Sequence, residues 1–236
     1  MSNPTRFTSG VTTVPPSDLL GSYPLPEPFH TGSTSTVGVC AYENDFCNVG
    51  GTEYTATGSA TFPVSTTIAG GAAVLTPSGA TTAGSVYKTG QSFQFQAGNR
   101  FWYATRVQAS AVSGTKSFYV GLQAGSSVND GLWFSKAASS TSVNLVSTVG
   151  STATTLVTGV ATAAAATWLD VGFYFDGVDL LIFVNNALVS RVSAPTIGSS
   201  GTKLTNAILT PVFQITPTAT DTLTVDYVLA AQEITR

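Results

Sequence analysis

Two pairs of acidic residues have a spacing that polysaccharide hydrolysis could use. Glycoside hydrolysis needs two carboxyl groups about 5–9.5 Å apart across the scissile bond. Glu43 and Asp45 are two positions apart, so on a β-strand they would face the same way. Asp176 and Asp179 flank a predicted hairpin turn, where acidic side chains usually serve the turn and face water. Neither pair has a third acidic neighbour in sequence. Asp130, Asp176 and Asp179 also supply too few oxygens for a calcium site, which needs six or more. From these acids we therefore expect no enzyme and no metal.

Histidine and cysteine offer equally little for catalysis. His30 is the only histidine, and it lies in a proline-rich segment. A nucleophilic triad instead needs a histidine on a rigid framework beside its nucleophile. In an extended chain, Cys40 and Cys47 would lie about 23 Å apart, too far for a disulfide without a turn. Two cysteines and a distant histidine do not make a zinc site. We therefore expect no catalytic residue, no cofactor and two reduced thiols.

Aromatic residues gather in three alternating runs, at 101–103, 133–134 and 173–175. Successive side chains of a strand point to opposite faces, so about half of these rings must enter a core. An outward ring such as Trp102 or Tyr174 would be available for a carbohydrate cleft or a protein contact. The sequence leaves these two uses open.

Composition excludes several partners. Charged residues make up 9% of the 236 residues, against about 25% in an average soluble domain. A surface with few charges costs little to desolvate, which suits permanent assembly or secretion, although compositional drift gives the same pattern. The net charge is −3, and no cluster of Lys and Arg marks a nucleic-acid surface. No apolar run approaches the ~20 residues that span a bilayer, and the first ten residues do not resemble a signal peptide, so we expect synthesis in a cytoplasm.

The region 168–192 gives the clearest structural pattern. Leu169, Val171, Phe173 and Phe175 alternate with Asp170, Gly172 and Tyr174, as in a half-buried strand. Asp176-Gly177 and Asn185-Asn186 then supply tight turns. This pattern predicts a three-stranded meander. Further strands are predicted at 100–108, 117–123, 132–136, 143–148, 208–215 and 223–230. Residues 162–167 contain four consecutive alanines and form either one helical turn or a loop.

These strands predict an all-β fold, an antiparallel β-sandwich spanning 39–236. Residues 1–38 differ, because they hold six of the eleven prolines and have no strand or helix periodicity. Such a segment is extended and cannot build its own core. We interpret it as an N-terminal docking arm in preference to a disordered tail, because disordered tails are depleted in apolar residues. The residues expected to contact a partner are Leu19, Leu20, Tyr23, Leu25 and Phe29.

Several short strings resemble those of a family of virion structural proteins of tailed bacteriophages. They are TRFTSGV (5–11), YENDF (42–46), FWYATRVQAS (101–110), FYVGLQ (118–123), DGLWFSKA (130–137), WLDVGFYFDGVDLLIFVNNALV (168–189) and TVDYVLAAQE (224–233). The resemblance implies a concanavalin A-like jelly roll. The acid-x-acid-x-x-acid signature of the glucanases that share this fold is absent, because Asn48 stands at the third acid position.

The resemblance implies a non-enzymatic capsid decoration (cement) protein on the outside of the head. Its expected partners are the major capsid protein and neighbouring copies of itself, as a homodimer or homotrimer, with no nucleic acid and no membrane. Its expected location is the virion capsid surface after synthesis in the host cytoplasm. The alternative is a carbohydrate-binding module on the virion surface, or, as a further rival, a glycoside hydrolase that uses Glu43 and Asp45.

Overall fold

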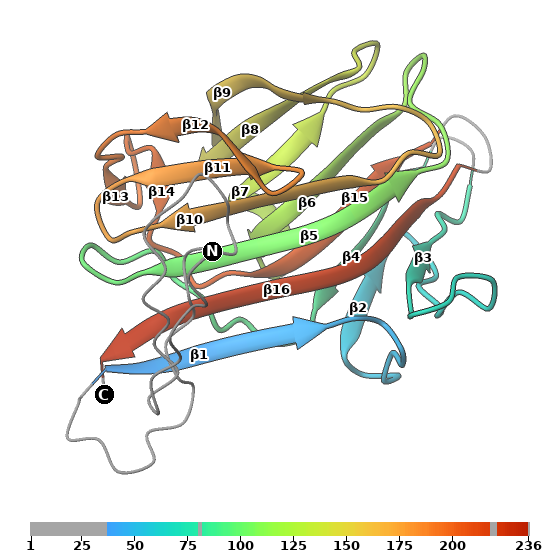
Figure 1. Cartoon of the computed structure of the whole chain (residues 1–236), viewed down its shortest axis with the longest axis horizontal. Coiled ribbons are helices and arrows are strands. Elements are labelled where there is room, and N and C mark those ends of the chain that lie inside the picture. Colours follow the sequence, from blue (N-terminus) through green and yellow to red (C-terminus); the bar gives the residue numbers. More distant parts are fainter. Residues whose placement is uncertain (1–36, 80–81, 218–220, 236) are drawn as a thin grey trace, which may run out of the picture.

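Two seven-stranded sheets stack face to face in the computed structural model, which describes residues 37–79, 82–217 and 221–235 (Figure 1). Sheet I has the strand order β1-β16-β5-β10-β11-β12, with β3 also pairing with β16. Sheet II has the order β2-β4-β15-β6-β7-β8-β9. The strands are β1 Val37–Asn44, β2 Tyr54–Thr57, β3 Ala73–Leu75, β4 Gly84–Lys88, β5 Phe101–Ala109, β6 Ser117–Ala124, β7 Ser127–Lys136, β8 Ser142–Val149, β9 Thr152–Thr162, β10 Leu169–Phe175, β11 Leu180–Val184, β12 Ala187–Val192, β13 Ile197–Gly198, β14 Leu204–Thr205, β15 Thr210–Thr216 and β16 Leu223–Thr235. The predicted all-β antiparallel sandwich is confirmed.

The predicted meander is the sequence β10-β11-β12, with both pairs antiparallel. Gly177 in the first turn has a φ of 97°, which glycine adopts at little cost. Asn185 and Asn186 have φ values of 48° and 63°, the left-handed conformation at both central positions that a two-residue hairpin favours. The turn chemistry read from these residues therefore produces the observed hairpins.

Strands whose side chains do not alternate in hydropathy were not predicted. β9 lies in a stretch rich in Thr and Ala, and its mostly exposed side chains do not alternate in hydropathy. β2, β3 and β4 are three to five residues long and lie in a region of similar composition. Residues 163–167 form a loop with a turn and no helix, which is the second of the two structures predicted for this alanine-rich segment.

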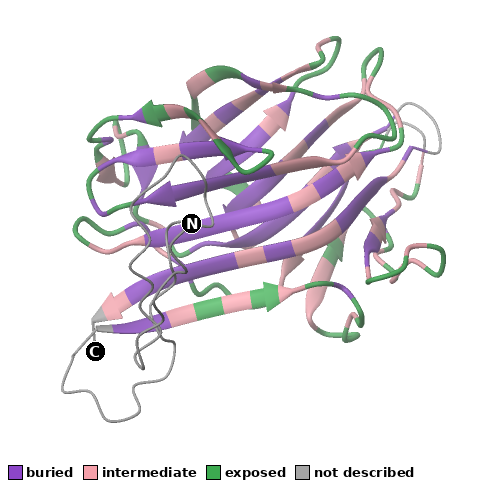
Figure 2. Ribbon diagram, viewed as in Figure 1, coloured by how far each residue is buried: buried purple, intermediate pink, exposed green. Residues whose placement is uncertain are grey.

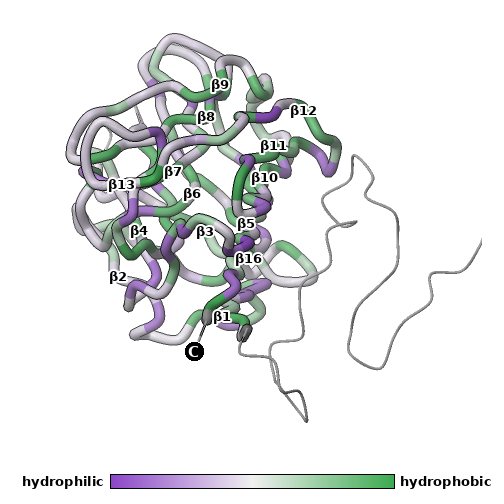
Figure 3. The backbone as a smooth tube through the Cα atoms, turned by 90° about the vertical axis from the view of Figure 1, so that its left-hand side faces the viewer, coloured by the Kyte–Doolittle hydropathy of each residue, from purple (hydrophilic) through white to green (hydrophobic). Residues whose placement is uncertain are grey.

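The main core lies between the sheets, and the central strands are largely buried, as the purple segments of Figure 2 show. Figure 3 shows the two layers from the side, coloured by hydropathy. Strand alternation drives this arrangement, because Phe101 and Tyr103 of β5 point inward beside Phe173 of β10. The ring of Phe173 lies 5.7 Å from that of Phe101, 5.3 Å from Tyr103 and 5.8 Å from Phe95. Each such aromatic ring removes about 150–250 Å² from water. This cluster ties β5 and β10 to the loop that precedes β5.

The described part of sheet I begins at an edge. β1 starts at Val37, pairs only with β16 among the described strands, and so leads directly into the sandwich. The arm predicted at 1–38, with its five contact residues and His30, falls outside the described residues apart from its last two positions. The division into arm and sandwich stays a prediction. Within the described ranges, no helix is long and apolar enough to cross a membrane.

Replacing Phe173 with Ala should lower the free energy of unfolding by about 3–5 kcal/mol, because the change leaves a cavity among three aromatic rings. Urea denaturation followed by circular dichroism measures this. Val178→Ala is the matched control, since Val178 is 62% exposed and its loss should change stability by less than about 0.5 kcal/mol. Equal effects of the two substitutions would contradict the assigned core.

Candidate functional site

The acid pair at Glu43 and Asp45 does not form a site in the structure. Glu43 is exposed on the edge strand β1, which ends at Asn44, so the two acids do not share a strand face. Asp45 is also exposed, and its Oδ1 accepts a hydrogen bond from the backbone N–H of Cys47 at 3.3 Å. The carboxylate of Asp45 therefore stabilises the bend after β1. Cys40 and Cys47 are both free.

The second acid pair serves the β10–β11 hairpin. Oδ1 of Asp176 accepts hydrogen bonds from the backbone N–H groups of Val178 and Asp179 at 2.8 and 2.6 Å, as expected of a turn residue. Asp179 differs from the expectation, because it is buried and accepts hydrogen bonds from the backbone of Ala194 and from Arg191. These bonds hold the pKa of Asp179 below its usual value, the one from Ala194 contributing most. Asp179 thus anchors the segment after β12.

The described residues contain no group of three or more His, Cys, Asp or Glu side chains that would hold a metal ion. Asp130 accepts hydrogen bonds from the backbone of Gly150 and the hydroxyl of Thr205, at 3.1 and 2.7 Å. These bonds connect β7 to the turn at Gly150 and to β14.

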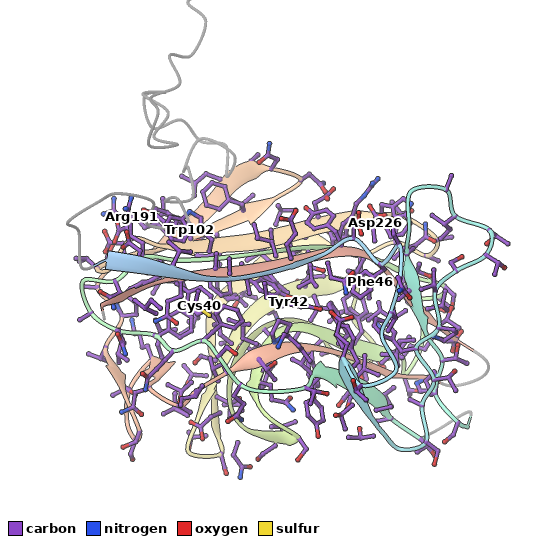
Figure 4. All side chains as sticks on the ribbon, turned by 90° about the horizontal axis from the view of Figure 1, so that it is seen from below. Cys40, Tyr42, Phe46, Trp102, Arg191 and Asp226 are labelled. Atoms are coloured by element: carbon purple, nitrogen blue, oxygen red, sulfur yellow. The ribbon has the colours of Figure 1, made fainter. Side chains whose placement is uncertain are left out.

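The outer face of sheet I carries the aromatic side chains that alternation directed outward. Ala231, Trp102, Tyr174 and Leu181 are paired in register across β16, β5, β10 and β11. Figure 4 shows Trp102 projecting from this face, whereas Cys40 and Tyr42 point between the sheets. The predicted outward orientation of Trp102 and Tyr174 is confirmed. Trp102 is nevertheless only 2% exposed and Tyr174 only 6%. The two rings therefore do not present an open stacking platform.

A depression lies beside this aromatic row. The next outward positions in register are Ala104 of β5 and Gly172 of β10, followed by Phe183 of β11. Because alanine and glycine fill so little space, they leave a hollow of about 470 Å³ between flanking rows of larger side chains. Asp170, Asn185, Asn186 and Tyr227 also line it. This volume is in the range of small-molecule sites.

The far side of the depression is a polar row. Asp170, Arg106 and Tyr227 are paired in register across β10, β5 and β16. Nε of Arg106 lies 3.8 Å from the Asp170 carboxylate, and the Tyr227 hydroxyl donates to the same carboxylate at 3.4 Å. Arg106 also donates from Nη1 to Asp226 at 3.1 Å. One guanidinium thus holds two carboxylates, so Arg106, Asp170 and Asp226 together carry one net negative charge.

A β-bulge places two polar side chains of β16 on this row. The register of β16 against β5 shifts between Val225 and Tyr227, leaving Asp226 as the extra residue. The bulge changes which positions face inward, from Val225 before it to Val228 after it. It brings both Asp226 and Tyr227 to Arg106, as strict alternation would not.

Trp168 completes the polar side of the site. The guanidinium of Arg106 lies 4.9 Å from the centre of the Trp168 ring, which is partly exposed. The turn at Asn185-Asn186 is exposed, and Oδ1 of Asn185 accepts from the backbone N–H of Asp170 at 3.3 Å. Carboxylate, amide and phenol groups beside an indole ring are a set that hydrogen-bonds hydroxyls and packs against C–H faces. The arrangement suits a polyhydroxylated ligand.

Burial and nearby negative charge perturb Tyr227. Burial, and next the carboxylate of Asp170, raise the pKa of Tyr227 to about 12 from a usual value of 10.0. The phenol therefore stays protonated well above neutral pH and acts as a hydrogen-bond donor. Because the folded state holds this proton more tightly, the stability gained from it is complete below pH 10.0 and is lost as the pH rises toward about 12.

The outer face of sheet II holds a second aromatic and amide cluster. The Tyr119 hydroxyl lies 2.7 Å from Oε1 of Gln214 and 3.0 Å from Oε1 of Gln123, either of which can accept its one hydrogen. The Tyr119 ring lies 5.2 Å from that of Trp133. A Cβ atom at Gly131 would lie 2.1 Å from the Trp133 ring, so glycine is required there. With Trp133 only 7% exposed, this cluster is closed by its own contacts.

Sequence reasoning placed Asp170 correctly on the outward face of its strand but did not identify it as a site residue. Arg106 and Tyr227 were not singled out. Asp170 and Tyr227 are separated by 57 positions in the chain, and only the pairing of β10 and β16 with β5 brings them together. One signal was available, since the apolar alternation of β16 changes phase between Val225 and Val228.

No family model matches the chain, and no curated protein matches it. Among solved structures, a protein of unknown function from Shewanella oneidensis MR-1 aligns with a TM-score of 0.61 and 11% identity, covering 86% of this chain and 90% of that one. A β-1,3-1,4-glucanase (lichenase) from a mouse hindgut metagenome aligns with a TM-score of 0.58 and 11% identity, covering 80% and 98%. Peanut lectin aligns with a TM-score of 0.53 and 10% identity, covering 84% and 99%. The chain has a concanavalin A-like jelly-roll fold.

The expectation that the chain is not an enzyme is wrong. It treated the sandwich as the fold of a passive coat component, whereas solved structures with this fold include glycoside hydrolases and a lyase. At these low identities the likeness shows the fold alone, and an enzyme is plausible on it. The two acid pairs noted in the sequence are close neighbours along the chain, whereas Asp170 and Asp226 are distant in sequence and meet through Arg106.

Replacing Asp170 with Asn should lower the pKa of Tyr227 from about 12 toward its usual value, because the substitution removes the negative charge beside the phenol. Ultraviolet absorbance of tyrosinate against pH measures the change, and subtraction of a Tyr227→Phe titration isolates Tyr227. Glu43→Gln is the control with an equal charge change at an exposed position. An unchanged Tyr227 titration in the Asp170 variant would show that the two groups do not interact.

Proposed function

We propose that this protein binds carbohydrate, and that the depression on the outer face of sheet I is the binding site. The observation that carries the proposal is the meeting of a small-residue floor, Ala104 and Gly172, with the polar row of Asp170, Arg106 and Tyr227. The fold adds support, because a lectin and a glucanase are among the structures that share it.

The polar row supplies groups that match sugar hydroxyls. The Asp170 carboxylate accepts hydrogen bonds, the Tyr227 phenol accepts one while its hydrogen is directed at Asp170, and the amides of Asn185 and Asn186 do both. Asp170 is only partly buried, with 36% of its side chain exposed, so its free lone pairs can be reached. Hydrogen bonds to an ionised group are about twice as strong as neutral ones, which makes Asp170 the main anchor.

The charge of the site selects a class of saccharide. Arg106 is shared by Asp170 and Asp226, so these three side chains together have one excess negative charge. An anionic sugar would bring like charges together as the site desolvates, and that juxtaposition is unfavourable. We therefore expect neutral saccharides to bind in preference to uronic acids.

Titration calorimetry of the full chain with neutral and uronic-acid oligosaccharides tests the proposal. The Asp170→Ala substitution should weaken binding of a neutral saccharide by about 10-fold or more, because a hydrogen bond to a charged group contributes about 1.5–3 kcal/mol. Tyr227→Phe should weaken it less, since the phenol hydrogen bond is neutral. Release of reducing ends in the same mixtures reports whether bound saccharide is also cleaved.

Glu43→Gln should leave binding unchanged, because Glu43 is exposed on β1 and does not line the depression. Tyr119→Phe provides a second control on the closed cluster of sheet II. Failure of every neutral saccharide to bind would contradict the proposal. So would binding that both variants of the polar row leave intact.

The capsid decoration role stays a prediction. The jelly-roll part of the resemblance is confirmed, whereas the comparisons give no support to a virion location or a capsid partner. The low charge of the chain still suits a permanent assembly. A carbohydrate site is compatible with such a role, since the alternative reading of the sequence was a carbohydrate-binding module on a virion surface.

A further inference from the structure

The outer face of sheet II carries no charge on its strands. The seven strands of this sheet contain three charged residues, Lys88, Asp130 and Lys136. Each of them is next to an outward residue of its strand and therefore belongs to the inner side. Lys88 lies 5.0 Å from the centre of the Tyr42 ring, Lys136 is buried, and Asp130 accepts the hydrogen bond from Thr205. The outward positions of all seven strands are thus uncharged.

The outer face of sheet I differs in this respect. Its outward positions include Arg106, Asp170 and Asp226 on the polar row. Glu43 and Glu233 add two more acids, on β1 and β16. The few charged side chains of the sandwich are therefore concentrated on one of its two faces, and the two faces suit different partners.

Uncharged polar side chains form a continuous row across six strands of sheet II. From β2 to β8, the residues paired in register are Thr57, Ser85, Gln214, Tyr119, Ser135 and Asn144. Gln214 lies next to the central strand β6 and is partly exposed. Its Oε1 lies 2.7 Å from the Tyr119 hydroxyl, whereas no described residue accepts a hydrogen bond from its Nε2. The row therefore has donors and acceptors available for a partner.

The next row keeps this face level. Trp133 is the largest side chain in it, and its ring lies over Gly131, where a Cβ atom would be only 2.1 Å from the ring. Trp133 also packs beside Tyr119 and is only 7% exposed. The indole ring therefore does not project from the face, and it offers no open surface on which a sugar could stack. A level sheet face suits packing against another level sheet face.

We propose that the outer face of sheet II pairs with the same face of a second copy of this chain. In a two-fold symmetric interface one surface meets itself, so every charged residue brings a like charge into the interface. Hydroxyl and amide groups avoid this conflict, because each can donate to or accept from its counterpart, and they cost less than charges to desolvate. Sheet I would instead bring together the excess negative charges of two copies.

The size of the face is sufficient for a specific dimer. With strands about 4.8 Å apart and about 3.4 Å per residue, the six intervals from β2 to β9 and the paired length Ser117–Gln123 of β6 give about 29 Å by about 20 Å. Each copy would then bury about 600 Å², and the pair about 1,200 Å², which is the lower end of the range for stable specific interfaces. An interface of this size and polarity predicts a dissociation constant in the micromolar range.

This inference goes beyond the proposed carbohydrate site and does not depend on it. Sheet II lies on the opposite side of the sandwich from the depression (Figure 1). Pairing through sheet II therefore leaves the depression of each copy on the outside of the dimer. The assembled protein would present two depressions, one on each of its outer faces.

Sedimentation velocity of the full chain tests the proposal, from about 1 to about 200 μM, a range that includes micromolar dissociation constants. The mass should rise from 24.2 kDa to twice that value. Gln214→Glu and Ser135→Lys should each weaken the dimer by about 10-fold or more, because each places an unpaired charge in the interface. Glu at 214 still accepts a hydrogen bond from Tyr119. Ser200→Lys is the matched control, since Ser200 is exposed in the loop after β13 and its substitution should leave the dimer unchanged.

An equimolar mixture of the Gln214→Glu and Ser135→Lys proteins should associate again, because the two copies then bring charges of opposite sign into one interface. This recovery separates a weakened interface from a misfolded variant. A mixture that stays monomeric would contradict the proposal. So would a chain that is monomeric at every concentration, a trimer, or a dimer that both variants leave intact. None of the substituted residues lines the depression, so these outcomes are independent of saccharide binding.

Discussion

The pairing of β5 with β10 on one side and β16 on the other is the constraint on which the rest of the structure depends. The register of these three strands sets Phe101 and Tyr103 against Phe173 in the core and, on the reverse face, aligns three successive rows. One row is aromatic, the next has Ala104 and Gly172, and the third joins Arg106 to Asp170 and Tyr227. A shift of one residue would exchange the two faces of a strand. The same hydrogen bonds that build the sandwich therefore build the depression.

The depression results from local choices of side-chain size and backbone irregularity. Alanine and glycine at adjacent in-register positions lower the floor, and the bulge at Asp226 turns two consecutive polar residues of β16 toward Arg106. Arg106 then compensates the charge of one of the two carboxylates that it contacts. The result is a polar edge beside a dry, apolar face, which is the contrast that a ligand with both hydroxyl and C–H surfaces requires.

The two faces of the sandwich have different uses for their aromatic residues. On sheet II, Trp133 is enclosed by Tyr119 and by the glycines beneath it, so the ring stabilises the sheet. On sheet I, the rings of Trp102 and Tyr174 lie 5.2 Å apart within an outer cluster that is itself nearly buried.

The sequence by itself determined the fold class, the β10-β11-β12 meander and the orientation of individual side chains. These depend on alternation and turn residues, such as Phe173 against Tyr174, or Asn185-Asn186, and alternation is a local property of the backbone. Only the tertiary structure decided which strands are neighbours. The acids that lie close in sequence, Glu43 and Asp45, remain apart from any cavity, whereas Asp170 and Asp226 meet at Arg106 across the sheet. Strand order and register are set by the packing of the whole core, and no local pattern encodes them.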